Sequence, residues 1–152
     1  MRRMIGVAAA GLLGLLALGL GGATDAAADC SGPSIRVSPT GGPEGSTATV
    51  TGEAFGNNCY DTGPPPPGEG VLGVPQSGVA ITFTDAAGTT TELATVDAGP
   101  QYRFVIEITV PEGAAPGAGR IDAVSPAGNP SAFGVPFEVS GGVIPATPAS
   151  TG

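Results

Sequence analysis

The chain has 152 residues with 27 glycines, 16 prolines, two cysteines and a net charge of −8. It contains no histidine, and its five basic residues are all arginine, which excludes a Ser–His nucleophile, a histidine metal site and a lysine Schiff base. The length suits one domain, and the acidic balance disfavours nucleic acid and anionic membranes as partners.

The first 28 residues have the three regions of a secretory signal peptide. Two arginines precede an apolar or glycine stretch over residues 4–23, and residues 26–28 supply the small side chains of a cleavage site. We therefore expect residues 1–28 to be removed on export. The secreted, extracellular chain that remains has a net charge of −9, because two arginines and one aspartate are lost. Its retention at the cell envelope and its release into the medium both stay open.

Cys30 and Cys59 are the only cysteines, and both remain after this cleavage. An exported chain meets an oxidising compartment, where an even pair of cysteines favours a disulfide. The Pro/Gly-rich stretch 38–47 predicts a chain reversal, which would bring both cysteines to the same end of an antiparallel pair of strands. We predict a Cys30–Cys59 disulfide and no metal site, because a thiolate site would lack a histidine and a third cysteine.

Seven segments alternate apolar and polar residues with the period of a half-buried strand. They are separated by turn residues, and no window has a convincing helical period. The segments are 35–37, 48–54, 79–84, 89–96, 102–110, 120–124 and 133–139. The last is expected to bury Phe133, Val135, Phe137 and Val139 together. Such a pattern predicts an all-β fold, a seven-stranded immunoglobulin-like β-sandwich over residues 29–140 with one disulfide.

Two segments fit no strand. Residues 141–152 form an uncharged low-complexity tail, expected to be flexible. Residues 60–78, YDTGPPPPGEGVLGVPQSG, form a long connection in which four consecutive prolines favour polyproline II structure. This connection is the candidate binding loop, with an aromatic side chain, two acids and an apolar cluster. Its candidate residues are Tyr60, Asp61, Glu69, Val71, Leu72 and Val74. The alternative is an insertion that a surface loop tolerates.

The stretch from Pro39 to Phe55 reads P-x-x-G-P-x-G-S-x-x-x-V-T-G-x-x-F and resembles the first hairpin of IPT/TIG-type immunoglobulin-like domains. Residues 108–139 resemble the end of such modules. The resemblance covers about residues 33–140 and implies an exported actinobacterial protein, because many such modules occur in exported proteins of high-GC Gram-positive bacteria. Members serve as spacers, adhesion modules, carbohydrate-enzyme accessories and dimerisation units, so the resemblance implies a fold more than a function.

We expect a non-enzymatic binding or structural module with no cofactor and with a protein, glycan or small-molecule partner. One alternative is a carrier of a small apolar ligand, as in the secreted chromoprotein family typified by neocarzinostatin, whose two disulfides are not matched here. A carbohydrate-associated accessory protein is a more remote alternative. Catalysis would need paired carboxylates. The candidates fit turns or exposed strand positions better; they are Asp85, Asp97, Glu107 and Asp122.

Overall fold

The computed structural model describes residues 30–141, which form an all-β fold without a helix in that range. The predicted signal peptide and, apart from Gly141, the predicted tail lie outside the described residues. The strands are β1 (Ser34–Ser38), β2 (Gly41–Pro43), β3 (Thr47–Glu53), β4 (Val79–Thr84), β5 (Thr90–Val96), β6 (Phe104–Thr109), β7 (Gly117–Val124) and β8 (Ala132–Ser140). None of the described residues belongs to a helix with the length and apolar character needed to span a membrane.

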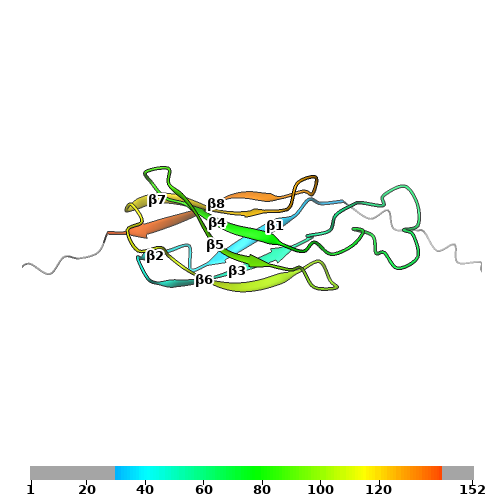
Figure 1. Cartoon of the computed structure of the whole chain (residues 1–152), viewed down its shortest axis with the longest axis horizontal. Coiled ribbons are helices and arrows are strands. Elements are labelled where there is room, and N and C mark those ends of the chain that lie inside the picture. The colour runs from blue at the N-terminus through cyan, green and yellow to red at the C-terminus, as the bar shows by residue number, and fades with distance from the viewer. Residues whose placement is uncertain (1–29, 142–152) are drawn as a thin grey trace, which may run out of the picture.

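The strands form two sheets. One has the order β1-β3-β6 and the other the order β2-β8-β7-β4-β5. Every named pair is antiparallel except β2 and β8, which run parallel. Figure 1 shows the strands lying along the long axis of the molecule, with the connection between β3 and β4 at one end. The turn between β4 and β5 lies at the opposite end, where β8 also ends.

The chain reversal predicted between the first two long strands is confirmed by the register of β1 against β3, in which Val37 pairs with Val50. The expected count of seven strands is wrong, because residues 41–43 form an eighth, short strand. The chain leaves the first sheet after β1, pairs with β8 in the second sheet, and returns as β3. A β-carbon at Gly41 would lie 2.7 Å from the carbonyl oxygen of Glu138, so glycine permits this approach.

One core is built from the inward side chains of both sheets. Val50 in the first sheet and Ile81 in the second are fully buried, as their alternation predicts. Phe83 and Phe137 meet edge to face, with ring centroids 6.0 Å apart. The core is therefore made of aliphatic and phenylalanine side chains, which hold the two sheets together by removing apolar surface from water.

The residues that carry the family resemblance shape the backbone and the core. Gly45 has a φ of +74°, the left-handed conformation that glycine adopts readily, in the turn before β3. The Ser46 hydroxyl donates a hydrogen bond of 2.6 Å to the carbonyl oxygen of Pro43 in the same turn. A β-carbon at Gly52 would overlap the ring of Phe104. The stretch therefore specifies turns and close packing.

The expectation that residues 133–139 bury their apolar side chains together is wrong for Phe133, which is 68% exposed, whereas Phe137 is 2% exposed. The register of β8 against β7 shifts at this point, and Gly134 has a φ of +79°. The resulting bulge adds one residue to β8. Ala132 therefore takes the inward position, and Phe133 faces solvent.

Candidate functional site

The candidate binding loop, residues 60–78, folds back on the residues that follow β3. Three backbone N–H groups donate across this ribbon: Asn57 to Val74 at 3.1 Å, Asn58 to Leu72 at 3.2 Å and Tyr60 to Val71 at 2.9 Å. The side-chain oxygen of Asn57 also accepts from the N–H of Val74 at 2.8 Å. The loop therefore has a defined shape at the end of the molecule (Figure 1).

Two glycines allow the loop to pack closely. A β-carbon at Gly56 would overlap the backbone of Leu72, and one at Gly70 would overlap the hydroxyl group of Tyr102. Backbone atoms cannot move aside as a flexible side chain can, so a side chain at Gly56 would push the two halves of the ribbon apart. These glycines are part of the structure of the loop and not merely a source of flexibility.

Two side chains for which the sequence predicted no role in the loop fasten it to neighbouring connections. The Tyr102 hydroxyl donates to the carbonyl oxygen of Gly73 at 3.0 Å. The Gln76 side chain is 2% exposed, and its amide donates to the carbonyl oxygens of Gly56 at 2.7 Å and Pro130 at 3.2 Å. No pattern identifies Gln76, because a polar residue in a Pro/Gly-rich connection is ordinarily exposed.

The predicted disulfide is confirmed: Cys30 is bonded to Cys59, with their Cα atoms 6.0 Å apart. It joins the residues before β1 to the root of the candidate loop. The two sulfur atoms and a carboxylate oxygen of Asp61 lie within 4.8 Å of one another. Sulfur atoms that share a disulfide offer no thiolate to a metal ion, so this cluster is a covalent anchor.

Tyr60 and Glu69 close the base of the proline segment. The Tyr60 hydroxyl donates to Oε2 of Glu69 at 2.7 Å. This hydrogen bond raises the pKa of Tyr60, and burial of the phenol adds to the effect, while the Asn58 side chain opposes it. The physical cause is that a phenolate could not donate and would face the negative charge of Glu69.

The ionisation of Tyr60 gives a direct test of this closed geometry. In alkaline titration at 295 nm, with the Tyr60→Phe signal subtracted, we expect a midpoint above the ordinary tyrosine pKa of about 10. Glu69→Gln should lower that midpoint. Because the folded pKa is raised, the contribution of this hydrogen bond to stability is lost as the pH rises above 10. Glu107→Gln, on an exposed strand position, is the control; an unchanged midpoint in Glu69→Gln would contradict the geometry.

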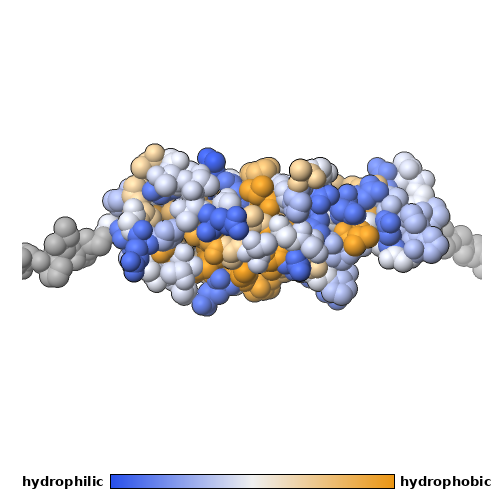
Figure 2. Space-filling view, viewed as in Figure 1, coloured by the Kyte–Doolittle hydropathy of each residue, from blue (hydrophilic) through white to orange (hydrophobic). Residues whose placement is uncertain are grey.

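The remaining candidate residues are distributed over the same loop. Val71 and Val74 are 43% and 45% exposed, Leu72 is half-buried and Asp61 is exposed. Figure 2 shows a small apolar patch amid polar surface at the end of the molecule formed by this loop. The structure thus brings Tyr60 and Glu69 into contact, and it presents two valines to solvent from a fixed ribbon.

The root of the loop contains two residues in a backbone conformation that is rare without glycine. Ala54 and Tyr102 have φ values of 61° and 60°. The N–H of Phe55 donates to the carbonyl oxygen of Tyr102 at 3.0 Å, so the two residues lie at neighbouring positions. Left-handed conformations cost a residue with a β-carbon about 1–2 kcal/mol, and such strain concentrates at binding and catalytic sites.

Replacing Ala54 with glycine should therefore stabilise the protein. The relief of about 1–2 kcal/mol is offset by the greater freedom of glycine in the unfolded chain, which leaves a net gain of about 0.5–1 kcal/mol. Chemical denaturation followed by circular dichroism measures the change. Ala94→Gly in β5 is the matched control and should destabilise, because its backbone gains nothing from glycine. A loss of stability in Ala54→Gly would show that the conformation carries no strain.

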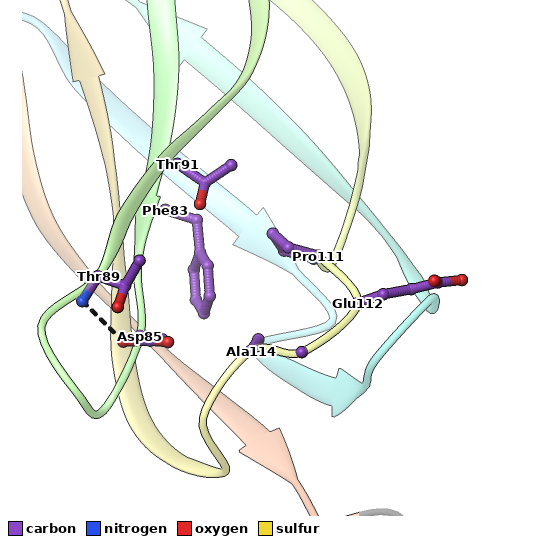
Figure 3. A pocket seen from close by; sticks show the side chains of 8 residues that line it. Phe83, Asp85, Thr89, Thr91, Pro111, Glu112 and Ala114 are labelled. Carbon is purple, nitrogen blue, oxygen red and sulfur yellow. Dashed lines mark hydrogen bonds between the residues drawn. The ribbon is translucent and has the colours of Figure 1, made fainter.

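A hollow of about 90 Å³ lies at the opposite end, between the β4–β5 turn and residues 111–114, with Phe83 between them (Figure 3). The carboxylate of Asp85 accepts from the N–H groups of Thr89 at 2.8 Å and Ala115 at 3.0 Å. Donation from Ala115, followed by that from Thr89, holds the pKa of Asp85 below its ordinary value. Asp85 therefore fastens two connections together, in agreement with its expected role as a turn residue.

The bonds to Asp85 predict an acid-sensitive contribution to stability. Because the folded pKa is lowered, the contribution is complete above the ordinary aspartate pKa of about 3.9 and falls as the pH drops through the lowered value. Thermal unfolding between pH 5 and 2 should therefore decline less steeply in Asp85→Asn than in the unmodified protein. Asp61→Asn removes an exposed carboxylate and is the control. Parallel curves for Asp85→Asn and the unmodified protein would refute the contribution.

Comparisons of the chain with protein-family models and with curated proteins find no match. The resemblance to IPT/TIG-type domains therefore rests on the Pro39–Phe55 stretch and the segment 108–139.

Proposed function

We propose that this chain is a non-enzymatic, exported immunoglobulin-like module of the IPT/TIG type that binds a partner at the cell envelope or in the medium through the loop 60–78. One observation carries the proposal. The loop is fastened by a disulfide at its root, by the Tyr102 hydroxyl and by the buried amide of its own Gln76, yet it presents Val71 and Val74 outward. A merely tolerated insertion would need no such fastening, and ordering before binding lowers the entropic cost of association.

The arrangement of the strands supports the immunoglobulin-like part of the proposal. Two sheets of three and five strands share one core, as the two layers of a β-sandwich do. The disulfide supports folding in an oxidising compartment and, with it, export.

The acidic side chains favour a binding role over glycoside hydrolysis. Asp122 is 5% exposed, accepts from the N–H of Gly134 at 2.6 Å and pairs with Arg120 at 2.9 Å. Asp97 accepts from the N–H of Gly78 at 2.8 Å. These carboxylates are engaged in backbone and ion-pair contacts, whereas a catalytic pair would face each other across a substrate.

The hollow beside Asp85 offers little support for a carrier of small apolar ligands. Ligand pockets are typically about 300–1,000 Å³, and this hollow is about 90 Å³. It is also lined by two acidic residues, Asp85 and Glu112, and by the exposed Thr89 and Thr91, which do not suit an apolar guest. Binding through the surface of the loop is therefore the function we put forward.

Co-sedimentation of the exported form with envelope fractions and pull-down from the culture medium of the source cell test this function. We expect saturable binding that Val71→Ser together with Val74→Ser weakens roughly tenfold, because truncation of anchors at a contact has effects of this size. Both substitutions change exposed side chains and leave Gln76 and the loop glycines in place.

Val105→Ser is the matched control, since Val105 is 69% exposed on the edge strand β6. It should bind as the unmodified protein does. Failure of the unmodified protein to bind either fraction, or equal binding by the double variant, would overturn the proposed function.

A further inference from the structure

We propose that the segment Pro64–Pro67 is a preformed polyproline ligand that docks into a protein partner whose groove is lined by aromatic side chains and flanked by basic ones. The proposal rests on the proposed function and names the class of partner for the same loop. The segment lies at the tip of the loop, between the residues joined by the Tyr60–Glu69 hydrogen bond. Its ligand chemistry follows from its composition, because proline has no N–H and offers only ring surfaces and carbonyl oxygens.

A backbone hydrogen bond and a glycine inside the loop fix the conformation at the end of the Pro64–Pro67 segment. The carbonyl oxygen of Pro66 accepts from the N–H of Glu69 at 3.0 Å, and Gly68 has a φ of +90°. These features, with Pro67 before the glycine, describe a type II turn. The first central residue of such a turn has polyproline-like dihedral angles. The extended left-handed segment can therefore run through Pro67 and end at Gly68.

The exposure pattern leaves two edges of the segment free. A polyproline II helix has three residues per turn, so Pro64 and Pro67 share one edge while Pro65 and Pro66 occupy the others. Pro65 is half-buried, and Pro64, Pro66 and Pro67 are exposed. The Pro65 edge thus faces the protein, and the remaining two edges face solvent, where a groove can receive their rings.

The charges that flank the prolines indicate which residues would surround the groove of the partner. Gly63 to Gly68 carry no charge, while Asp61 and Glu69 stand on either side of that run. Asp61 is exposed, and the exported chain is strongly acidic. A groove with arginine or lysine at its rim would therefore be attracted to the segment, and an acidic groove would be repelled.

The fastening of the loop explains why such a ligand would be presented here. The Cys30–Cys59 disulfide and the hydrogen bond between Tyr60 and Glu69 fix both arms that lead to the prolines. Prolines also have little conformational freedom to lose. Docking would therefore cost less entropy than docking of a free peptide of the same sequence.

The test uses the full exported chain and two purified probes, a WW domain and an SH3 domain, each with a basic rim and a tryptophan in its proline-binding groove. The chain contains no tryptophan, so fluorescence excited at tryptophan wavelengths reports on the probe alone. We expect saturable binding to at least one probe, tighter than that of a linear peptide of residues 61–69. Pro64→Ala with Pro66→Ala and Pro67→Ala should weaken it at least about tenfold.

Pro126→Ala with Pro136→Ala is the matched control, because both prolines are exposed outside the loop, and it should bind unchanged. The raised pKa of Tyr60, measured in each variant, reports whether the loop has kept its shape. Equal binding by the triple variant, or binding to neither probe when both bind a proline-rich control peptide, would overturn the inference. So would proline-dependent binding to envelope polysaccharide stripped of protein.

Different experimental results would reject the proposed function and the polyproline ligand. Envelope or medium binding that depends on Val71 and Val74, with neither probe bound, would retain the proposed function and reject the polyproline ligand. Probe binding that depends on the prolines, without any binding to envelope or medium, would retain the polyproline ligand and reject the proposed function.

Discussion

Replacing Phe55 with alanine is expected to lower the free energy of unfolding by about 3–5 kcal/mol, the usual cost of emptying a buried phenylalanine site. The Phe55 side chain is fully buried, and its ring lies 4.9 Å from that of Phe104. Its carbonyl oxygen accepts from the N–H of Gln76 at 3.0 Å, so the cavity would open beneath the root of the candidate loop. Denaturant unfolding followed by circular dichroism measures the loss.

Phe133→Ala deletes the same atoms at a position that is 68% exposed, and it should change stability by no more than about 0.5 kcal/mol. The pair of variants also tests the bulge in β8. Similar losses of unfolding free energy for Phe55→Ala and Phe133→Ala would mean that Phe133 faces the core, as simple alternation predicts, and that β8 has no bulge there.

Replacing Cys30 and Cys59 by serine is expected to cost about 3–4 kcal/mol, because the disulfide closes a loop of 29 residues in the unfolded chain. A domain of this size has a total stability of about 5–15 kcal/mol, so the loss would be a large part of it. The loop should loosen as well, since Cys59 directly precedes Tyr60. The Tyr60 pKa is therefore expected to fall toward its ordinary value in this variant.

Reduction of the unmodified protein provides an independent route to the same state. Urea unfolding midpoints of the reduced protein and of the Cys30→Ser/Cys59→Ser variant should agree, and both should lie well below that of the oxidised protein. A difference under about 1 kcal/mol between oxidised and reduced protein would contradict a stabilising role for the disulfide.

The two ends of the molecule differ in how their connections are held. At one end, Asp85 fastens the β4–β5 turn to the connection before β7 through backbone N–H groups. At the other, the loop 60–78 is held by a disulfide, by Tyr102 and by Gln76. Within residues 30–141, the second end carries the exposed valines Val71 and Val74 and a run of exposed prolines on a fixed frame. This contrast is why the proposed contacts are assigned there.

Much of the fold follows from patterns that act over a few residues. Alternation placed Val50, Ile81 and Ile121 in the core, and all three are buried. The Pro/Gly-rich reversal and the oxidising compartment expected from the predicted signal peptide predicted the pairing of Cys30 with Cys59, and the disulfide is present. The candidate loop was also recognisable, because four prolines and several glycines cannot continue a ladder of strand hydrogen bonds.

Other features depend on residues that are distant in the sequence. The strand at 41–43 has no alternation to detect, and it exists because its backbone meets β8 nearly a hundred positions later. The exposure of Phe133 follows from a one-residue shift between β7 and β8, and a shift of register reverses the faces of a strand. Gln76 is buried, and its amide donates to the carbonyl oxygen of Gly56 in the same connection and to that of Pro130 in the connection between β7 and β8.

Local patterns in the sequence were enough to predict an all-β protein with one disulfide and a long Pro/Gly connection after one strand. Those properties depend on side-chain period, cysteine count and backbone restriction, which are local. The hydrogen bonds from Tyr60 to Glu69 and from Tyr102 to Gly73, and the exposure of the prolines, became known from the packing of the folded chain. These contacts require segments separated along the chain to be packed together, because a hydrogen bond forms only where distance and direction are both satisfied.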